Sequence, residues 1–493
     1  MIKNNELIRK YFDENSVVKS DIESFNHFID KGISEIISEI GDIVPTIIPP
    51  EMEDFRIKLD KVEVEKPSIV EADGSKRNIY PSEARLRKIS YSAPVFLNVS
   101  VHVDGIQRES FRTQIAKIPI MVKSKYCHLS TLNREQTIEK GEDPDDPGGY
   151  FILNGNERVL ITVEDLASNK MFFERKKIGP SKYVAHVFSE RGAYRIPHEI
   201  AQHKDGIIYL SFTRFKKLPI ISVIKALGLV KDEEIVKAIS TEEQFDDVIV
   251  NLYNNVDLRS QNDALEYVGK KSGIEQPKEV VIEKTLDNLD RYLLPHLGIE
   301  KDNRMAKAYN LAKLVRRFLI LANRQIGVDK DHYMNKRLKL SGDLLMDLFR
   351  VNVRALVNDL LYNFQRLVKR GKFSSVKIII RDRLLTDRIK SALATGSWVG
   401  GRKGISQNMD RTNFLASLSH LQRVNSLLSA SQENFAARAL HCTHFGRLCP
   451  IETPEGTSIG LRKNIALLGS VTQGVFNEEK LKKTFVSLGL KEV

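Results

Sequence analysis

The chain has 493 residues, 42% of them hydrophobic and 28% charged, so it can form large cores and is not disordered by composition. No stretch approaches the ~20 apolar residues of a membrane span, and the start lacks a signal-peptide core, which predicts a cytoplasmic protein without membrane contact. The net charge of +12 favours a polyanionic partner such as nucleic acid, although lysines scattered over a solvated surface would give the same value.

The first part of the chain is predicted to form a helix followed by strands. Residues 21–40 carry one apolar stripe at helical spacing. Alternating apolar residues at 95–103 predict a strand, and the Asp104-Gly105 pair predicts a hairpin turn after it. The Asp73-Gly74 pair predicts an earlier turn. Residues 117–129 have the pattern of a buried strand.

Between these strands, the basic residues Arg85, Arg87 and Lys88 allow two interpretations of equal weight, a solvated rim or a nucleic-acid contact. The acidic stretch that follows, at 142–149, resembles a calcium loop only superficially, because Asn154 stands where an EF-hand needs Glu. A turn made possible by Gly148 and Gly149 is the preferred interpretation.

The middle of the chain is predicted to contain an inserted domain with no catalytic constellation. Its clearest element is a helix at 303–325 with one apolar face. A second long helix is predicted at 341–370, with Ser341 as its N-cap and Gly371 after its end. A strand at 376–380 and a helix at 381–394 are expected to follow.

The late segment 395–468 is the most informative part of the sequence, especially HCTHFGRLCPIETPEG at 441–456. Its prolines and glycines exclude a regular helix or a central strand, and charged, loop-rich segments are more often functional surfaces than linkers. The cysteines Cys127, Cys442 and Cys449 are expected to be reduced thiols. No zinc site is expected, because the His and Cys residues near 442 form one arm of ligands where a structural site needs two.

This segment resembles the fork region of the second-largest subunit of multisubunit DNA-dependent RNA polymerases. The resemblance is carried by His441, Thr443, His444, Gly446, Arg447, Cys449, Pro450, Glu452, Thr453, Pro454, Glu455, Gly456, Gly460 and Leu461. It extends from about Lys19 onward. Since the family's subunit is more than twice as long, the chain resembles the N-terminal part of a second-largest (B-type) subunit that some archaea encode as two polypeptides.

The resemblance implies an α+β multidomain fold of mixed sheets and helices. It implies a first part of the protrusion domain at 1–163, an inserted lobe at 164–333 and a second part of the protrusion at 334–394. The fork region would occupy 395–493, and the hybrid-binding, wall and clamp domains would lie outside the chain.

The resemblance also implies a non-catalytic role in the nucleotidyltransferase DNA-directed RNA polymerase. In this family the aspartates that bind the catalytic Mg²⁺ lie on the largest subunit, so we expect no activity from the chain alone and no metal held mainly by it. The implied partners are the largest subunit (A′), the second half of the split subunit (B′), other polymerase subunits, template and downstream DNA, and RNA. The alternative is a free-standing, nonspecific nucleic-acid-binding protein.

Seven residues are the candidate contacts with nucleic acid or the active centre: Arg402, Lys403, Arg423, Arg438, His441, Arg447 and Glu455. A separating duplex offers phosphates and unstacked bases, which guanidinium and ammonium groups can bind. The resemblance implies that Arg423 lies near the template or hybrid, and that Arg438, His441 and Arg447 face the active centre.

For Glu455 the resemblance implies a place near the incoming nucleotide, and the rival interpretation is an ion pair with Arg438 or Arg447. Three further expectations concern structure. Glu452 is expected to be structural. The single tryptophan, Trp398, is expected to anchor the core rather than stack on a base. The stripe of Phe414, Leu415 and Leu418 is expected to belong to the core.

Overall fold

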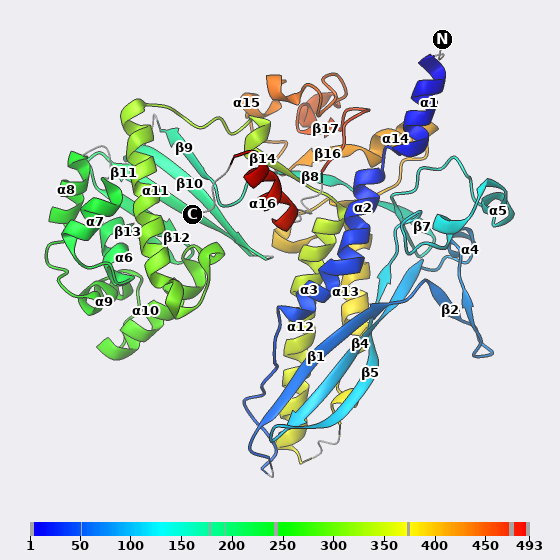
Figure 1. Ribbon diagram of the computed structural model, residues 1–493, viewed down its shortest axis with the longest axis horizontal. Helices are drawn as coiled ribbons and strands as arrows, with labels where there is room; N and C mark the ends of the chain where they lie inside the picture. Colours follow the sequence, from blue (N-terminus) through cyan, green and yellow to red (C-terminus); the bar gives the residue numbers. More distant parts are fainter. Residues whose placement is uncertain are drawn as a thin grey trace. The chain divides into compact units, whose positions relative to one another are not determined.

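The computed structural model describes residues 4–50, 52–176, 179–192, 194–240, 245–371, 375–472 and 478–489. The chain divides into two compact units, the first made of residues 1–165 and 338–493 and the second of residues 166–337 (Figure 1). Both contain helices and antiparallel sheets, which confirms the predicted α+β multidomain class.

The main sheet of the first unit has the order β1-β4-β5 and is antiparallel. Its strands are β1 (Phe55–Val64), β4 (Ser92–Val103) and β5 (Ile106–Pro119). The predicted hairpin is confirmed: Asp104 and Gly105 have φ values of 52° and 79°, as a two-residue turn between twisted strands requires. The predicted Asp73-Gly74 turn joins β2 (Ser68–Val70) and β3 (Lys76–Asn78).

Helices from both ends of the first unit's sequence pack with this sheet. They are α2 (Lys19–His27), the π-helical turn η1 (Phe28–Gly32), α3 (Ile33–Ser38), α12 (Ser341–Lys369) and α13 (Asp382–Thr395). Helix α13 packs on β5 and α3 on β1, while α12 contacts α2, α3 and α13. The helices predicted at 21–40, 341–370 and 381–394 are thereby confirmed.

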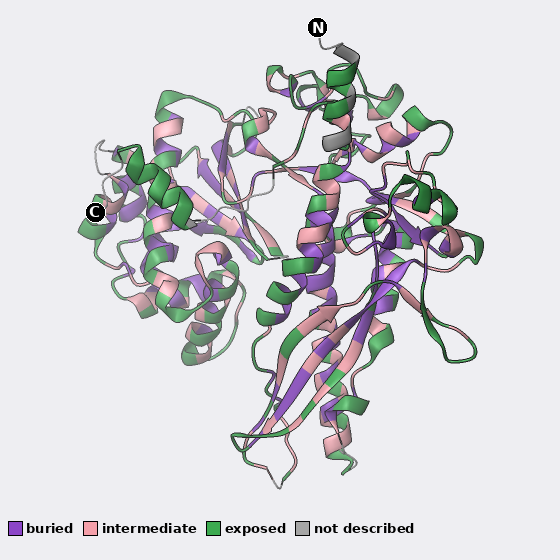
Figure 2. Cartoon of the chain, turned by 45° about the vertical axis from the view of Figure 1, so that its right-hand side comes forward, coloured by how far each residue is buried: buried purple, intermediate pink, exposed green. Residues whose placement is uncertain are grey.

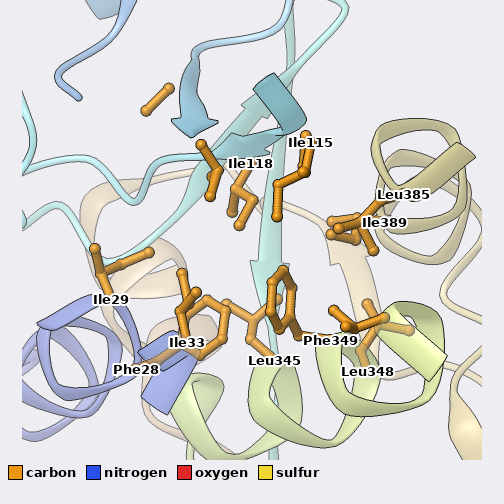
Figure 3. Close-up of a cluster of buried hydrophobic side chains, with 14 of the residues drawn as sticks. Phe28, Ile29, Ile33, Ile115, Ile118, Leu345, Leu348, Phe349, Leu385 and Ile389 are labelled. Atoms are coloured by element: carbon orange, nitrogen blue, oxygen red, sulfur yellow. The ribbon is translucent and has the colours of Figure 1, made fainter. Parts of the chain in front are cut away.

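The core of the first unit lies where these helices meet the sheet (Figure 3). Figure 2 shows buried residues running along the strands and the helix faces. Buried apolar side chains from η1, α3, β5, α12 and α13 converge there: Phe28, Ile33, Ile115, Ile118, Leu345, Phe349, Leu385 and Ile389. Segments more than 300 positions apart in sequence share this core, so both parts of the first unit are needed to complete it.

Three local predictions for this unit are wrong. Ser341 is not the N-cap of α12: Asp343 accepts the Leu340 N–H at 3.1 Å, and the Ser341 N–H instead donates to Asp21 at 2.9 Å. Residues 376–380 contain the 3-10 turn η6 (Val376–Ile378) rather than a strand. The strand predicted at 117–129 ends at Pro119, and turns lead to the 3-10 helix η2 (His128–Thr131).

The acidic stretch before β6 is a turn, as predicted. The Asp146 carboxylate accepts the Gly148 N–H at 2.8 Å. Gly148 has φ +74°, and a Cβ there would lie 2.6 Å from the Val122 carbonyl oxygen, so a side chain is excluded. The strands β6 (Phe151–Leu153) and β7 (Asn156–Leu160) follow, joined by a hairpin turn at Asn154 and Gly155.

Short elements complete the first unit: α1 (Asn4–Glu14), α4 (Pro81–Leu86), α5 (Arg134–Glu139), η7 (Val399–Gly401), β15 (Ser406–Asn408), α14 (Phe414–Leu421), α15 (Phe435–Arg438), η8 (Cys442–His444), η9 (Gly456–Ser458) and α16 (Glu478–Ser487). A mixed sheet has the order β14-β8-β16-β17, with β8 (Thr162–Leu166), β14 (Lys336–Lys339), β16 (Arg423–Ser426) and β17 (Arg462–Asn464). None of the described helices combines the length and apolar character needed to cross a membrane.

The second unit is built on a five-stranded antiparallel sheet of order β13-β12-β11-β10-β9. Its strands are β9 (Met171–Arg175), β10 (Ser181–Arg191), β11 (Tyr194–His203), β12 (Ile208–Phe212) and β13 (Phe215–Pro219). Its helices are α6 (Ile220–Ala226), α7 (Asp232–Ile239), α8 (Asp246–Tyr253), α9 (Gln261–Lys271), α10 (Lys278–Tyr292), η3 (Pro295–Leu297), η4 (Lys301–Asn303), α11 (Arg304–Arg324) and η5 (Tyr333–Asn335). Helix α11 confirms the helix predicted at 303–325, and the unit has its own hydrophobic core.

Candidate nucleic-acid interface

The late segment contributes two strands to the mixed sheet. Strand β16 pairs antiparallel with β17 and parallel with β8 (Figure 1). Because side chains alternate along a strand, Arg423, Asn425 and Arg462 lie on one face of the β16–β17 pair. Val424 and Lys463 lie on the opposite face, and both are buried.

The buried face holds an ion pair. Lys463 Nζ lies 3.0 and 2.9 Å from the two carboxylate oxygens of Glu164 in β8, and the two side chains are 8% and 3% exposed. Lys463 is one of the basic residues of the segment 395–468, but a buried and paired ammonium is not available to a phosphate.

Two further basic residues of the segment pair with carboxylates from earlier in the chain. Arg402 Nη2 lies 3.1 Å from Asp165 Oδ2, and both side chains are mostly buried. Arg411 donates to Glu157 at 2.7 Å and to Asp146 at 2.9 Å, and its guanidinium lies over the ring of Tyr150. Within the segment itself, acidic residues are few, so the sequence gives no sign of this neutralisation.

The basic residues near the start of the chain are also paired. Arg85 donates to Glu142 at 2.9 Å, to Glu157 at 2.7 Å and to the hydroxyl of Tyr150 at 2.7 Å. Arg87 pairs with Glu71 at 2.7 Å and also with Glu83. The sequence left two interpretations open for Arg85, a solvated rim or a nucleic-acid contact. In the structure Arg85 instead connects side chains at 142, 150 and 157.

Arg423 differs from these arginines. It is half-buried, and its guanidinium makes no hydrogen bond or ion pair with the rest of the described chain. Burial and the neighbouring Arg462 guanidinium lower the pKa of Arg423, while Asp410 and Glu452 oppose the shift. Like charges in a partly desolvated place favour an anion between them.

The nearby carboxylates are already engaged. Asp410 accepts the N–H and the hydroxyl of Thr412 at 3.0 and 2.8 Å. Glu452 accepts a hydrogen bond from Ser419, which supports the structural role expected for it. Both carboxylates are therefore held by neutral donors beside Arg423, and neither forms an ion pair with it among the described residues.

Arg462 and Asn425 share this face; Arg462 is one of the basic residues of the segment, whereas the sequence did not single out Asn425. Arg462 is exposed. The side-chain oxygen of Asn425 is buried and has no hydrogen-bond partner within the described ranges. The spacing of Arg423 and Asn425, two positions apart, could have indicated that they share one face of a strand. The pairing of this strand with β17, which brings Arg462 to the same face, was not predicted.

Arg438 holds two loops together. Its guanidinium donates to the carbonyl oxygens of Thr457 and Ile459 at 2.6 and 3.0 Å, and to those of Ala430 and Gln432 at 2.8 and 3.1 Å. The four carbonyl acceptors use four of the five N–H donors of the guanidinium, those of Nη1 and Nη2. In this structure Arg438 therefore fixes the loop before α15 against the segment at 457–459.

Two other candidate residues make local contacts in the same segment. His441 Nδ1 accepts the Thr443 N–H at 3.2 Å and thereby caps η8. Arg447 is exposed and donates to the carbonyl oxygen of Thr443 at 3.2 Å. The two side chains thus share one anchoring residue, which brings them together at the start of the 441–456 stretch.

Glu455 and Lys403 are exposed, and neither forms an ion pair with any residue that the structure describes. The pairing of Glu455 with Arg438 or Arg447, which the sequence left open, is not formed, since both arginines donate to carbonyl groups. Glu455 is therefore free to face a ligand.

Of the apolar residues expected in the core, Trp398 is buried but Phe414 and Leu415 are not. Trp398 is buried, and its indole N–H donates to the Leu344 carbonyl oxygen at 2.9 Å, which confirms it as a core anchor. The prediction that Phe414 and Leu415 belong to the core is wrong, because they are 57% and 74% exposed. In α14 the inward positions are instead taken by polar residues such as His420.

His420 is buried by the loop before α14. Its Nδ1 accepts the Asp410 N–H at 3.1 Å, and its Nε2 lies 3.2 Å from the Gln407 amide oxygen. Burial and the nearby Arg423 lower the pKa of His420 to about 4, so the ring is neutral at physiological pH. This neutral ring adds no charge beside Arg423.

No group of three or more His, Cys, Asp or Glu side chains in the described ranges is placed to hold a metal ion. All three cysteines are free: Cys127 is buried and Cys442 exposed, with Cys449 between these extremes. The described part of the site therefore consists mainly of arginine and lysine side chains and loop backbone.

Comparison with known proteins identifies the family. The model for "RNA polymerase beta subunit" matches residues 16–387, and the model for "RNA polymerase Rpb2, domain 3" matches residues 407–471. The chain is 41% identical to DNA-directed RNA polymerase subunit Rpo2 of Saccharolobus shibatae, over 99% of this chain but 43% of that protein. It thus spans less than half of the length of this relative.

Other relatives match over nearly their whole length. DNA-directed RNA polymerase subunit Rpo2N of Methanocaldococcus jannaschii is 41% identical over 95% of both chains. Rpo2N of Halobacterium salinarum is 40% identical over 99% of this chain and 96% of that protein. The chain therefore belongs to the RNA polymerase beta subunit family and corresponds in extent to its Rpo2N members.

Proposed function

We propose that this chain is a non-catalytic part of DNA-directed RNA polymerase, the N-terminal portion of its second-largest subunit. The family models and the Rpo2N relatives support this proposal. In this role the chain forms part of the DNA cleft and positions nucleic acid for DNA-templated RNA synthesis, while the reaction takes place on other subunits. We also propose the cytoplasm as its location, which is consistent with a polymerase subunit.

The observation that carries the role of the site is the face shared by Arg423, Asn425 and Arg462. Among the residues that the structure describes, the Arg423 guanidinium has no hydrogen-bond or ion-pair partner and the Asn425 side-chain oxygen has no hydrogen-bond partner, while Arg462 is exposed. Phosphate oxygens accept two parallel N–H bonds from a guanidinium, and one such contact contributes roughly 1–3 kcal/mol. We assign Arg423 to the template or hybrid backbone, with Lys403 as a further phosphate contact.

The other candidate residues take different roles in the proposal. Arg438 shapes the loop that faces the active centre, since its donors are occupied by carbonyl groups. Arg402 supports this region through its pair with Asp165. His441 and Arg447 line the same segment, and exposed Glu455 lies near the incoming nucleotide.

The metal chemistry of nucleotidyl transfer belongs to partner chains in this proposal. Mg²⁺, when bound in the assembled enzyme, aligns the RNA 3′ hydroxyl and the triphosphate, and it is held mainly by clustered carboxylates. The described residues offer no such cluster, and no zinc site is assigned to the chain. The chain's own contribution is to bind and orient the nucleic acid.

The proposed partners are the largest subunit (A′), the second half of the split subunit (B′), other polymerase subunits, template and downstream DNA, and RNA. We assign residues 1–163 and 334–394 to the protrusion, residues 164–333 to the lobe and residues 395–493 to the fork. The separation of residues 166–337 as a compact unit supports the assignment of an inserted lobe.

Reconstitution tests the proposal directly. The chain is combined with the remaining polymerase subunits, and extension of an RNA primer on a DNA template is measured with and without it. We expect extension only by the complete assembly and none by the chain alone. Primer extension by the purified chain, or full activity of an assembly that lacks it, would refute the proposal.

Purification from native cells separates this function from that of a free-standing nucleic-acid-binding protein. The polymerase subunit co-elutes with the other polymerase subunits. A monomeric species that never co-elutes with them would favour the free-standing alternative, which family membership does not support.

A further inference from the structure

Helix α8 of the second unit presents an apolar face to solvent. Ile249 is 65% exposed, Val250 47%, Tyr253 83% and Val256, just beyond the helix, 49%. The spacing places these four side chains on one side of the helix and its continuation. The inward side is occupied by Val248 and Leu252, so α8 is apolar on both sides although only one is covered.

Buried polar contacts hold this face in a fixed place. The Asn251 side chain accepts the Ile208 N–H at 2.8 Å and donates to the Gly206 carbonyl oxygen at 3.0 Å. Lys225, which is 3% exposed, donates to the carbonyl oxygens of Asn255 and Leu258 at 3.3 and 3.2 Å. A surface already ordered before binding loses little entropy when a partner docks.

The surroundings of the face are acidic although the chain as a whole carries a net charge of +12. Residues 204–206 and 245–259 contain four acidic side chains, at 205, 246, 247 and 257, and two basic ones, at 204 and 259. A Cβ built on Gly206 would lie 3.8 Å from Asp247 Oδ1 and 3.9 Å from Val250, so the hairpin that carries Asp205 lies against the face. A phosphodiester backbone would be repelled here, whereas lysine or arginine side chains would be attracted.

We propose that this α8 face, made of Ile249, Val250, Tyr253 and Val256, is a docking surface for an amphipathic helix of a protein partner. The partner's apolar stripe is flanked by lysine and arginine residues that face Asp246 and Asp247. An apolar helix face laid against another with a charged rim is a recurrent mode of recognition, and an exposed tyrosine is a typical anchor. This inference goes beyond the proposed function, because it needs no nucleic acid and lies in the second unit.

The test uses the full chain and a fluorescently labelled synthetic peptide. The peptide has 16 residues in our design, slightly longer than an average helix of about 10–14 residues, with leucines at helical spacing and lysines elsewhere. Anisotropy measures its binding, and a scrambled peptide of the same composition is the first control. We expect the helical peptide to bind and the scrambled one not to bind.

Variants of the chain locate the binding. Replacing both apolar anchors, Ile249→Ser with Tyr253→Ser, should weaken binding about tenfold or more, whereas Tyr253→Phe should retain it. Ile326→Ser is the matched control, because Ile326 is also exposed, at 53%, in the same unit. Asp246→Asn with Asp247→Asn should weaken binding roughly threefold and flatten its salt dependence.

Each contrary result overturns the inference. The inference is wrong if the double-serine variant binds the helical peptide as well as the parent chain does. It is also wrong if the scrambled peptide binds equally well, or if the helical peptide does not bind. Duplex DNA whose binding is lost in the double-serine variant would identify the face as a nucleic-acid surface instead. The thermal unfolding of each variant checks that a loss of binding does not come from a loss of folding. Because the replaced side chains are exposed, we expect each variant to fold.

Discussion

Lys463 and Glu164 form a buried ion pair that joins strands β17 and β8, 299 positions apart in sequence, with Nζ–O distances of 2.9 and 3.0 Å. Both side chains are almost inaccessible to solvent. The pair lies on the face of the sheet opposite Arg423 and Arg462, so it fixes the strands that present these arginines.

Glu164→Gln should destabilise the first unit, because it removes the carboxylate that pairs with the buried Lys463 ammonium. Breaking such a pair costs about 3–5 kcal/mol. The free energy of unfolding in urea measures the loss. The double replacement Glu164→Leu with Lys463→Met removes both charges and should recover most of the stability; a double variant as unstable as the single one would contradict this account.

Arg438→Ala should reduce the transcription rate of the reconstituted polymerase without preventing assembly. The change frees the four carbonyl groups at 430, 432, 457 and 459, so the two loops lose their common anchor. Arg438→Lys should recover little, since an ammonium cannot donate to four acceptors in a plane. Elongation rates are measured on a fixed template, and an unchanged rate in the alanine variant would show the assignment to be wrong.

The isolated chain should bind DNA weakly, with an affinity that falls steeply as salt is added. Arg423→Gln should reduce the slope of log affinity against log salt by about 1, because one phosphate contact is lost. Arg383→Gln, which replaces an exposed arginine of α13, serves as the control and should leave the slope nearly unchanged. Binding that does not depend on salt would rule out the phosphate contact.

His420 should make stability fall as the pH is lowered. Its pKa is lowered from 6.5 to about 4 in the folded chain, so between these values the unfolded state binds more protons and folding loses free energy. From pH 7 to pH 5.5 this loss amounts to roughly 1 kcal/mol.

The variant His420→Gln should lack this part of the pH dependence. The difference in unfolding free energy between the variant and the parent chain at the two pH values measures it. An NMR titration of the imidazole provides an independent check, and a midpoint near 6.5 would contradict the prediction.

Gly460→Ala should be strongly destabilising, because a Cβ at this position would lie 2.2 Å from the Arg438 carbonyl oxygen and φ is +71°. We expect a loss of at least about 2 kcal/mol, from the clash and the left-handed backbone together. Gly456→Ala is the matched control: φ is +81° there, but no atom lies within 4 Å of the added Cβ. Thermal unfolding compares the two, and equal losses would exclude the clash as the cause.

Much of the local structure follows from the sequence. The hairpin at Asp104-Gly105 and the helices at 21–40, 303–325, 341–370 and 381–394 were predicted, because each depends on residues within a few positions of one another. The resemblance to the RNA polymerase family also rests on sequence alone, and the comparisons bear it out. The failed strand at 376–380 shows the limit, since a short apolar run does not distinguish a buried strand from a buried turn.

The candidate site depended on tertiary structure. Arg402, Arg411 and Lys463 look as basic in the sequence as Arg423, yet they meet Asp165, Glu157 and Glu164, which lie more than 200 positions earlier. Phe414 and Leu415 have the spacing of core residues but are exposed, because the loop before α14 buries His420 instead.

The sequence by itself therefore determined most helices and turns, because these depend on neighbouring residues. It also determined the family of this protein, because the family shares a recognisable pattern of residues. Only the tertiary structure decided which of the described cations form ion pairs with carboxylates. Charge neutralisation acts through space over a few ångströms, and the folded chain brings together carboxylates and arginines whose separation in sequence carries no information about their distance.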